Sequence, residues 1–443
     1  VFHGIKKLEA LVLDGNNIAE LDSFLFKSLV NLQVINLQNN SLNIIEDDTF
    51  YDLNNMQFVN LTQNQIVQLT LRSFHGLGNK AILLVDSRTI CCFVEQHNGP
   101  HCITLEKESP YLTCSQLLPN NVIKSLVWII GICTLFSNTA VLIWGCLEIF
   151  SQTNEIIKQK IFIINLAASD LLMAIYLLIL GATDNSYGEY FPLHADMWRN
   201  NSLCTISGVI SVLSSEASLF FIAIISVERF WIFKNIRNNI FSTRKSRVIT
   251  VISVWVFAII LSTIPIGLPE DQYSYSEVCI GLPLVRNLQV TSKLENITLD
   301  PNPYLTSTNL SVPIEPTTGT SLYSYYAIGL FLGVNGLCCL TVLFCYVGIF
   351  IIVKFLTPHM IMSVSRRKRE IRMALKMGLI VMTDLLCWMP IVILGILVQT
   401  ERITMNPTSY AWIVAFVLPI NSAINPFLYA LGHILSNYYD RIQ

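Results

Sequence analysis

Seven long apolar stretches follow one another between residues 122 and 431. Each holds about 20 to 30 mostly apolar residues, enough for an α-helix to cross the roughly 30 Å hydrocarbon core of a bilayer. We therefore expect an all-α bundle of seven membrane-spanning helices. The predicted spans are 122–147, 159–182, 204–233, 247–268, 322–354, 373–399 and 408–431.

Lys and Arg residues predict the orientation of these spans, because positive charge is retained on the cytoplasmic side of short loops. The loops after the third and fifth spans are rich in both residues, and the opposite loops are poor in them. The N-terminus is therefore predicted to lie outside the cell and the C-terminus inside. Glycosylation sequons on the predicted outer side agree with this orientation. They begin at Asn39, Asn60, Asn200, Asn296 and Asn309.

A different apolar pattern repeats in the first 77 residues with a period of 24. Each copy follows L-x-x-L-x-L-x-x-N-x-L, with Ile, Met or Val at some apolar positions, and the repeat asparagines are Asn16, Asn40 and Asn64. This is the leucine-rich-repeat pattern, which predicts an α/β solenoid that binds large partners on its concave face. We expect residues 1–79 to be the C-terminal part of a longer array. Asp14, Gln38 and Thr62 are expected to point to the concave face.

Four cysteines follow the repeats within 24 residues: Cys91, Cys92, Cys102 and Cys114. In an extracellular segment they indicate two disulfides, with three pairings open. A zinc site that includes His97 and His101 is the alternative. Residues 80–121 are therefore expected to form a cysteine-containing cap or hinge between the repeats and the first span.

The third span carries polar residues at both ends. Cys204 lies 25 residues before Arg229, which separates the two by about 38 Å of helix, close to the full thickness of a bilayer. Cys204 is then at the outer end, and Cys279 is the other outer cysteine beyond the hinge. We predict a Cys204–Cys279 disulfide that folds residues 269–321 over the mouth of the bundle.

At the inner end Arg229 has two candidate acidic partners. Glu228 is its neighbour, and Glu370 lies 18 residues before Trp388, about 27 Å along the sixth helix and level with Arg229. An Arg229–Glu370 ion pair is predicted to hold the third and sixth spans together at rest. The alternative is that both side chains extend into the headgroup region.

Polar side chains in the middle of a membrane are costly and need a reason. Asp170 places an acid in the second span, and the oxygens of residues at a similar depth suit a sodium ion or a water cluster around it. Those residues are Ser218, Asn421, Ser422 and Asn425. Glu216 is expected either to contact a ligand or to bond to Asn335.

Two prolines lie beside this polar centre. Pro390, in Cys387-Trp388-Met389-Pro390, and Pro426 each remove a helix hydrogen bond and predict kinks that act as hinges. The composition agrees with a membrane protein, because 53% of residues are hydrophobic and 13% are charged. The chain has no activated nucleophile pair, zinc-helix motif or phosphate-binding glycine loop. We therefore expect no enzymatic activity, no transition metal and no nucleic-acid partner.

These motifs together resemble the rhodopsin-like G-protein-coupled receptors over about residues 120–443. The resemblance rests on Asn138, Asn165-Leu-Ala-Ala-Ser-Asp170, Cys204, Glu228-Arg229-Phe230, Trp255, Cys387-Trp388-Met389-Pro390 and Asn425-Pro426-Phe427-Leu428-Tyr429. It implies a heterotrimeric G protein at an inner lock of Glu228, Arg229, Glu370, Tyr346 and Tyr429. It also implies an activation switch of Asp384, Trp388, Pro390, Asn425 and Pro426.

Within that class the chain is similar to the leucine-rich-repeat-containing receptors. Thr383-Asp384, Leu418-Pro419 and Gly333-Val334-Asn335 resemble this group, and Ser214-Ser215-Glu216-Ala217-Ser218 is most similar to relaxin receptors and their invertebrate relatives. The paired Cys91-Cys92 is instead similar to glycoprotein-hormone receptors.

We therefore expect a multi-pass plasma-membrane receptor with residues 122–432 as its membrane domain and 433–443 as the start of a cytoplasmic tail. Its expected partners are an extracellular peptide or protein hormone, a heterotrimeric G protein and membrane lipid. A glycoprotein-hormone-type receptor and an adhesion protein anchored by seven helices are the alternatives. A transporter is disfavoured, because the sequence shows neither inverted repeats nor interrupted helices with charged substrate sites.

Overall fold

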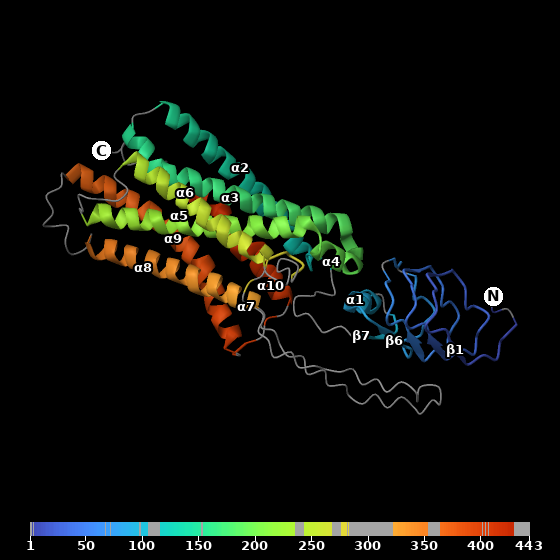
Figure 1. Cartoon of the computed structure of the whole chain (residues 1–443). Helices are drawn as coiled ribbons and strands as arrows, with labels where there is room; N and C mark the ends of the chain where they lie inside the picture. The colour runs from blue at the N-terminus through green and yellow to red at the C-terminus, as the bar shows by residue number, and fades with distance from the viewer. Residues whose placement is uncertain are drawn as a thin grey trace. The chain divides into compact units, whose positions relative to one another are not determined.

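The structure is a computed structural model, shown in Figure 1, whose parts fall into two compact units. The first unit contains the N-terminal residues up to Leu117 and the segment Tyr187–Met197, and the second contains the long helices from Leu118 onward. The described residues are 2, 4–66, 68–70, 72–96, 99–104, 116–151, 154–234, 243–267, 276–280, 282, 322–352, 364–400, 402–403, 405 and 407–428.

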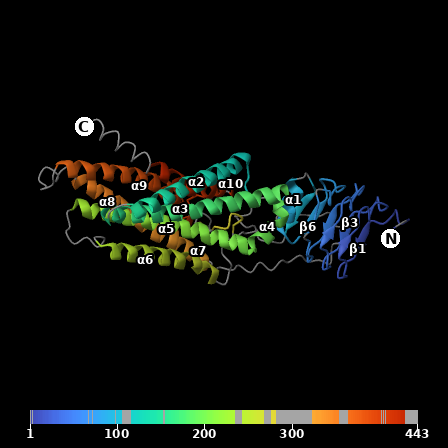
Figure 2. The ribbon, with the colours of Figure 1, turned by 90° about the horizontal axis from the view of Figure 1, so that it is seen from above.

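A parallel sheet forms the framework of the first unit. Its strands run in the order β1 (Ala10–Val12), β3 (Val34–Asn36), β5 (Phe58–Asn60), β6 (Ile82–Val85) and β7 (His101–Thr104). Ala10 pairs with Val34, Val34 with Phe58 and Phe58 with Ile82, so successive strands from β1 to β6 are displaced by 24 residues along the chain. A second parallel pair joins β2 (Glu20–Leu21) to β4 (Ile44–Ile45). The predicted repeat solenoid is confirmed, and Figure 2 shows β1, β3 and β6 following one another in the order of the sheet.

The same period organises the interior of the repeats. Phe26 and Phe74 both stack on Phe50, with ring centres 5.8 and 6.1 Å away, and buried leucines surround these rings. Left-handed backbone recurs at the same step, at Gly15, Asn39 and Gln63. A different left-handed turn at Gly76 requires glycine, because a Cβ atom there would approach the Phe50 carbonyl oxygen to 2.3 Å.

The repeat asparagines complete the backbone hydrogen bonds between turns. Asn40 Nδ2 donates to the carbonyl oxygens of Leu13 and Leu37 at 2.9 and 3.0 Å, and its Oδ1 accepts the N–H of Ile18 at 3.1 Å. Asn64 makes the corresponding bonds one repeat later. Each asparagine therefore satisfies buried polar groups in two successive repeats.

The cysteine-containing cap continues the sheet beyond residue 79. Helix α1 (Arg88–Gln96) lies between β6 and β7 in the sequence, and a Cys91–Cys102 disulfide ties it to β7. Cys92 is also disulfide-bonded, and Cys114 lies outside the described residues. The zinc alternative for these cysteines is therefore wrong.

Seven helices of the second unit are long and apolar enough to span a membrane, within the part of the chain that the structure describes. Their spans are Asn121–Leu147, Lys160–Tyr187, Ser202–Phe233, Arg244–Gly267, Tyr325–Ile351, Val381–Gln399 and Thr408–Leu428. The corresponding regular helices are α2 (Asn121–Ser151), α3 (Asn154–Tyr187), α5 (Ser202–Phe233), α6 (Arg244–Thr263), α8 (Asn335–Ile351) and α9 (Val364–Gln399). The short helices α7 (Leu322–Ala327) and α10 (Pro407–Trp412) begin the fifth and last spans.

The long helices form one bundle, with α5 in contact with α6, α8 and α9. The third span is the most buried of the seven described spans. Two π-helical segments interrupt regular helix, at Ile328–Val334 in the fifth span and Ile413–Val417 in the last. Pro390 lies inside α9. We call the last span, Thr408–Leu428, the last helix.

Replacing Asn40 by Ala should destabilise the repeats by about 1–3 kcal/mol, because buried backbone groups of neighbouring repeats lose their partner. Asn16→Ala is the matched control, since Asn16 holds the same repeat position but is exposed. Hydrogen exchange of β1 and β3 in the whole chain should be faster for Asn40→Ala than for Asn16→Ala. Equal exchange in the two variants would contradict the role given to the buried asparagine.

Candidate functional site

A buried carboxylate lies at the centre of the helical bundle. Asp170 of α3 is fully buried. Its Oδ1 accepts hydrogen bonds from Ser218 Oγ of α5 at 3.1 Å and Ser422 Oγ of the last helix at 2.9 Å. Its Oδ2 accepts one from Asn425 Nδ2 at 2.9 Å. Four of the residues predicted for a sodium or water site therefore come together, and they join three helices.

Asn421, the fifth predicted member of that set, is placed elsewhere. Its Nδ2 donates to Oδ1 of Asp384 in α9, so a second buried acid is held by the last helix. The other oxygens, Asp384 Oδ2 and Asn421 Oδ1, are buried without a partner among the described residues. The last helix thus binds two acids, Asp384 of α9 and Asp170 of α3, through residues that lie within about one helical turn of each other.

Further bonds connect the remaining helices to this centre. Asn138 Nδ2 of α2 donates to the Ser422 carbonyl oxygen at 3.0 Å. Trp255 Nε1 of α6 donates to Asn165 Oδ1 of α3 at 3.0 Å. The family-motif residues are therefore the polar connections between helices, which explains why polar side chains occur in these apolar spans.

Glu216 and Trp388 both contact the fifth span. Asn335 Nδ2 donates to Glu216 Oε1 at 3.0 Å, and both side chains are fully buried. Of the two roles expected for Glu216, the bond to Asn335 is the one observed. Trp388 of α9 stacks on Phe331, with ring centres 6.4 Å apart. Phe331 lies in the π-helical segment that ends directly before Asn335.

We call the end of the bundle that carries Cys204 the disulfide end. The predicted Cys204–Cys279 disulfide is confirmed, with the two Cα atoms 5.3 Å apart. Three side chains bond to the backbone on either side of Cys279. Tyr176 Oη donates to the Val278 carbonyl oxygen at 2.7 Å and Trp198 Nε1 to that of Glu277 at 2.8 Å, while Tyr410 Oη donates to that of Ile280.

Residues 276–280 and 282 are consequently buried. They are the residues that the structure describes in the segment 269–321, which was predicted to fold over the mouth of the bundle. They are held by α3, by the short helix α4 (Phe191–Arg199), by α5 and by α10. The sequence predicted the disulfide but not the hydrogen bonds from Tyr176, Trp198 and Tyr410. Tyr and Trp at span ends also occur as anchors at the membrane interface, so their presence there did not indicate such bonds.

A salt bridge at the same end holds the start of the membrane domain. Asp184 of α3 is buried, and its Oδ2 lies 3.0 Å from Lys124 Nζ of α2. Its Oδ1 accepts the backbone N–H of Leu118 at 3.0 Å. Leu118 is the first residue of the second unit. Asp184 therefore fixes the backbone at the point where the chain enters the bundle.

We call the opposite end of the bundle the Arg229 end. Glu228 Oε1 lies 2.7 Å from Arg247 Nη2 of α6, and both side chains are buried. Arg229 is also buried, and the ring of Tyr346 lies 3.4 Å from where a Cβ atom on Gly378 of α9 would be. The Glu370 side chain and Tyr429 lie outside the described residues. The Arg229–Glu370 pair therefore stays a prediction.

Sequence reasoning missed Arg247 because it was grouped with the loop cations. A signal was available, since Arg247 shares a helix face with Val254 and Ala258, which follow at seven and eleven residues. All three are buried. A cationic residue on the same helix face as buried apolar residues is itself expected to be buried.

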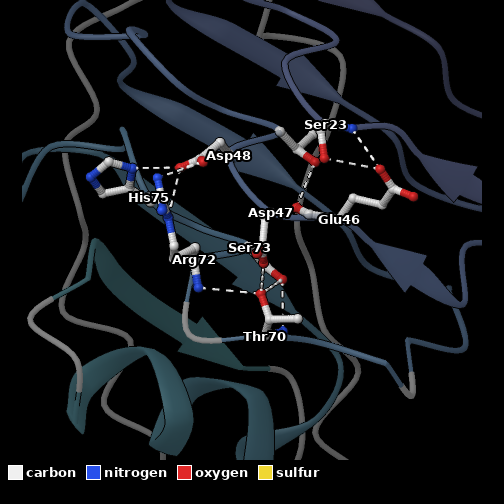
Figure 3. A network of polar contacts seen from close by, with 9 residues as sticks. Ser23, Glu46, Asp47, Asp48, Thr70, Arg72, Ser73 and His75 are labelled. Atoms are coloured by element: carbon white, nitrogen blue, oxygen red, sulfur yellow. Dashed lines mark hydrogen bonds and ion pairs between the residues drawn. The ribbon is translucent and has the colours of Figure 1, made fainter.

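The repeats carry a polar network on their surface, shown in Figure 3. Asp48 binds Arg72 Nη2 at 2.6 Å and His75 Nδ1 at 2.7 Å, and the Arg72 and His75 side chains are more than half exposed. Burial raises the pKa of the Asp48 carboxyl, but the bonds from His75 and Arg72 outweigh it, so the net pKa lies below the ordinary 3.8. Glu46 and Asp47 bond to Ser23 and Thr70 in the same network.

The glycosylation sites differ in exposure. Asn39 and Asn200 are exposed and stay predicted sites. Asn60 is 5% exposed and its Nδ2 donates to Gln38 Oε1 at 3.2 Å, so a glycan there would displace a buried side chain, and the site stays a prediction. Asn296 and Asn309 lie outside the described residues. Thr62, expected on the concave face, is also buried, whereas Asp14 is exposed.

Acid should weaken the repeats through Asp48. Its lowered pKa means that folding favours the charged form, so its contribution is complete at neutral pH and is lost as the pH falls below 3.8 through the folded-state pKa. Hydrogen exchange of the repeats should rise over that range in the native chain. Asp48→Asn should reduce this acid dependence, and Asp52→Asn, at an exposed position, should not. An unchanged acid dependence in Asp48→Asn would contradict the assignment.

Two family models match the chain. The seven-transmembrane receptor (rhodopsin family) model matches residues 137–290, and the leucine-rich-repeat model matches residues 6–79. Squid rhodopsin is a structural neighbour with a TM-score of 0.49 and 18% identity, covering 74% of this chain and 89% of its own.

Three curated proteins are similar to this chain. The G-protein-coupled receptor GRL101 of Lymnaea stagnalis is 29% identical over 81% of this chain and 29% of its own length. Human relaxin receptor 2 is 27% identical over 71% and 37%. A probable glycoprotein hormone G-protein-coupled receptor of Anthopleura elegantissima is 24% identical over 73% and 30%. The chain thus spans well under half the length of these relatives.

The two matched segments cover strands β1 to β5 of the repeats and the part of the bundle from α2 through Cys279. The chain thus resembles leucine-rich-repeat-containing G-protein-coupled receptors of the rhodopsin family, and it is similar to relaxin and glycoprotein-hormone receptors.

Proposed function

We propose that this protein is a plasma-membrane receptor that binds an extracellular peptide or protein hormone and activates a heterotrimeric G protein. The observation that carries the proposal is the polar centre, in which Asp170, Asp384 and their partners join α2, α3, α5, α9 and the last helix. Such a centre can be bonded in more than one way, and a receptor needs two alternative arrangements of its helices.

The repeats would lie outside the cell and bind the hormone. Relatives named as relaxin and glycoprotein-hormone receptors support a peptide or protein as the ligand. The cap and the segment around Leu118 would then pass the binding signal to α2 and α3. A hormone shifts the equilibrium only by as much as it binds the active arrangement more tightly.

Within the bundle, activation would change the bonds at the polar centre and move α9 at the Arg229 end. Arg229 and the surrounding basic residues would then meet the G protein. Opening of the predicted Arg229–Glu370 pair would accompany that movement. The apolar outer faces of the seven helices would be in contact with membrane lipid.

The Asp170 centre would also hold a sodium ion. Its donor set of one carboxylate, two hydroxyl oxygens and the Asn425 amide fits a hard cation. The Asn425 Oδ1 atom is buried without a partner among the described residues, which leaves an oxygen for this role. A water cluster would satisfy the same groups if no ion binds.

The test of this function is cyclic AMP and G-protein recruitment in cells that express the full-length protein at a measured surface level. Glu370→Ala should raise basal signalling because the pair to Arg229 is lost, and Arg229→Ala should abolish it. A response to a panel of relaxin-like peptides would support the hormone class. Silence toward every G-protein class at normal surface expression would contradict the proposal and favour adhesion.

Asp184→Ala should weaken the response to an active peptide from that panel without weakening its binding. The substitution removes the hydrogen bond from the Leu118 N–H and the salt bridge to Lys124. We expect this to cost about 1.5 kcal/mol of coupling between peptide binding and the response, so about ten times more peptide should be needed for a half-maximal response. Asp184→Asn keeps an acceptor for the Leu118 N–H and should have a smaller effect. An unchanged dose response in Asp184→Ala would rule out this route of transmission.

A further inference from the structure

A buried acid–amide pair joins α5 to the fifth span in the middle of the bundle. Glu216 lies 12 residues after Cys204 on α5, which is about 18 Å along the helix. Asn335 Nδ2 donates to Glu216 Oε1 at 3.0 Å, and both side chains are fully buried. Asn335 is the first residue of α8. The bond therefore fixes the start of α8 against α5.

Each member of this pair has one further oxygen. Glu216 Oε2 and Asn335 Oδ1 are buried and make no hydrogen bond to a described residue. When the carboxyl group is charged, both atoms are acceptors only, so they cannot bond to each other. A proton on Oε2 turns this oxygen into a donor. A planar carboxyl group and a planar amide group then pair through two hydrogen bonds, and no oxygen is left unsatisfied.

The surroundings of Glu216 also favour the neutral form. Tyr326 and Cys338 of the fifth span interact with it electrostatically, and Cys338 interacts in turn with Asp384 of α9. None of these groups is a cation, and neither Glu216 oxygen lies in an ion pair with a described residue. A charged carboxylate inside a bilayer without a cation is so costly that the group takes up a proton instead.

The pair also lies directly after the π-helical segment Ile328–Val334. Tyr326 Oη donates to the Leu261 carbonyl oxygen of α6 at 2.7 Å, just before this segment, and Asn335 bonds to α5 just after it. A π-helix bonds each residue to the fifth one along the chain instead of the fourth, so it holds more residues per turn than an α-helix. Its return to α-helix would rotate α8 about its axis. The bond at Asn335 opposes that rotation.

We propose that Glu216 carries a proton in the folded protein and donates it in a hydrogen bond to Asn335 Oδ1, so that loss of this proton releases the fifth span at its π-helical segment. The inference concerns the bundle itself and does not rest on the proposed hormone or G protein. When the proton leaves to bulk water, Glu216 Oε2 and Asn335 Oδ1 are again two acceptors. The pair then opens, and α8 turns.

The first experiment is infrared difference spectroscopy of the full-length protein in lipid nanodiscs at neutral pH. Subtracting the spectrum of Glu216→Gln from that of the unsubstituted protein should leave the carbonyl band of a protonated carboxyl group, which shifts in heavy water. Asp170 and Asp384 are present in both proteins, so their bands cancel. A carboxylate band in the difference spectrum would overturn the inference, since Glu216 would then be charged and a water molecule would have to bridge the two oxygens.

The second experiment follows the distance between spin labels at Ile249 of α6 and Val347 of α8, two exposed positions, as the pH rises from neutral to alkaline. In the unsubstituted protein a second distance should appear. The ratio of its population to that of the first should grow about tenfold per pH unit, which is the dependence for the release of one proton. Glu216→Gln keeps both hydrogen bonds and cannot ionise, so its distances should not depend on pH.

Ser215→Ala is the matched control for this experiment. It removes a neighbouring buried hydroxyl that bonds to no described residue, so the variant should behave like the unsubstituted protein. Asn335→Leu removes the acceptor of the proton and should show the second distance already at neutral pH. Distances that ignore pH in the unsubstituted protein, or that change equally in Glu216→Gln, would overturn the inference. Glu216→Gln preserves the pair, so it keeps the test decisive even if Asn335→Leu fails to fold.

Discussion

A carboxylate buried inside a membrane-spanning bundle must be satisfied by its neighbours, and the arrangement of the helices depends on how this is done at Asp170. Water is absent from the hydrocarbon region, so an unsatisfied polar group there costs several kcal/mol. Ser218, Ser422 and Asn425 supply the hydrogen bonds from two other helices. Asn138 then joins α2 to the same turn of the last helix. A shift of any of these helices would break bonds that cannot be replaced by solvent, which favours a few discrete arrangements.

The leucine-rich repeats depend on a different constraint, the 24-residue period. The fixed register of its strands places the same repeat position of successive turns side by side. Interior positions keep similar side chains, such as the stacked phenylalanines. Surface positions vary, so Asp48 meets Arg72 and His75 from the following repeat. Regular positions thus build the scaffold, and differences between repeats build the surface that a partner meets.

Local patterns in the sequence were sufficient to predict the spans and the repeats, because apolar length and period are properties of single elements. The Cys204–Cys279 bridge and most of the Asp170 set could be predicted from depth along helices. The rotation of each helix about its axis could not be predicted in this way. Asn421 was therefore assigned to Asp170, although it bonds to Asp384. Two ion pairs, Glu228 with Arg247 and Asp184 with Lys124, each join two helices. They could not be predicted, because a single stretch of sequence does not show which helices are neighbours. The π-helical segments were missed because neither contains a proline, although Pro419 follows the second by two residues.

We propose that the buried acids control the arrangement of the Arg229 end. The most direct test of this proposal is a distance measurement between spin labels at the Arg229 ends of α5 and α9, made on the full-length protein in lipid nanodiscs. Replacing Asp384 by Asn removes the carboxyl group that Asn421 binds, and we expect a second, longer distance that is rare in the unsubstituted protein. Identical distance distributions in the two proteins would contradict it, because the acid on α9 would then have no influence on that end.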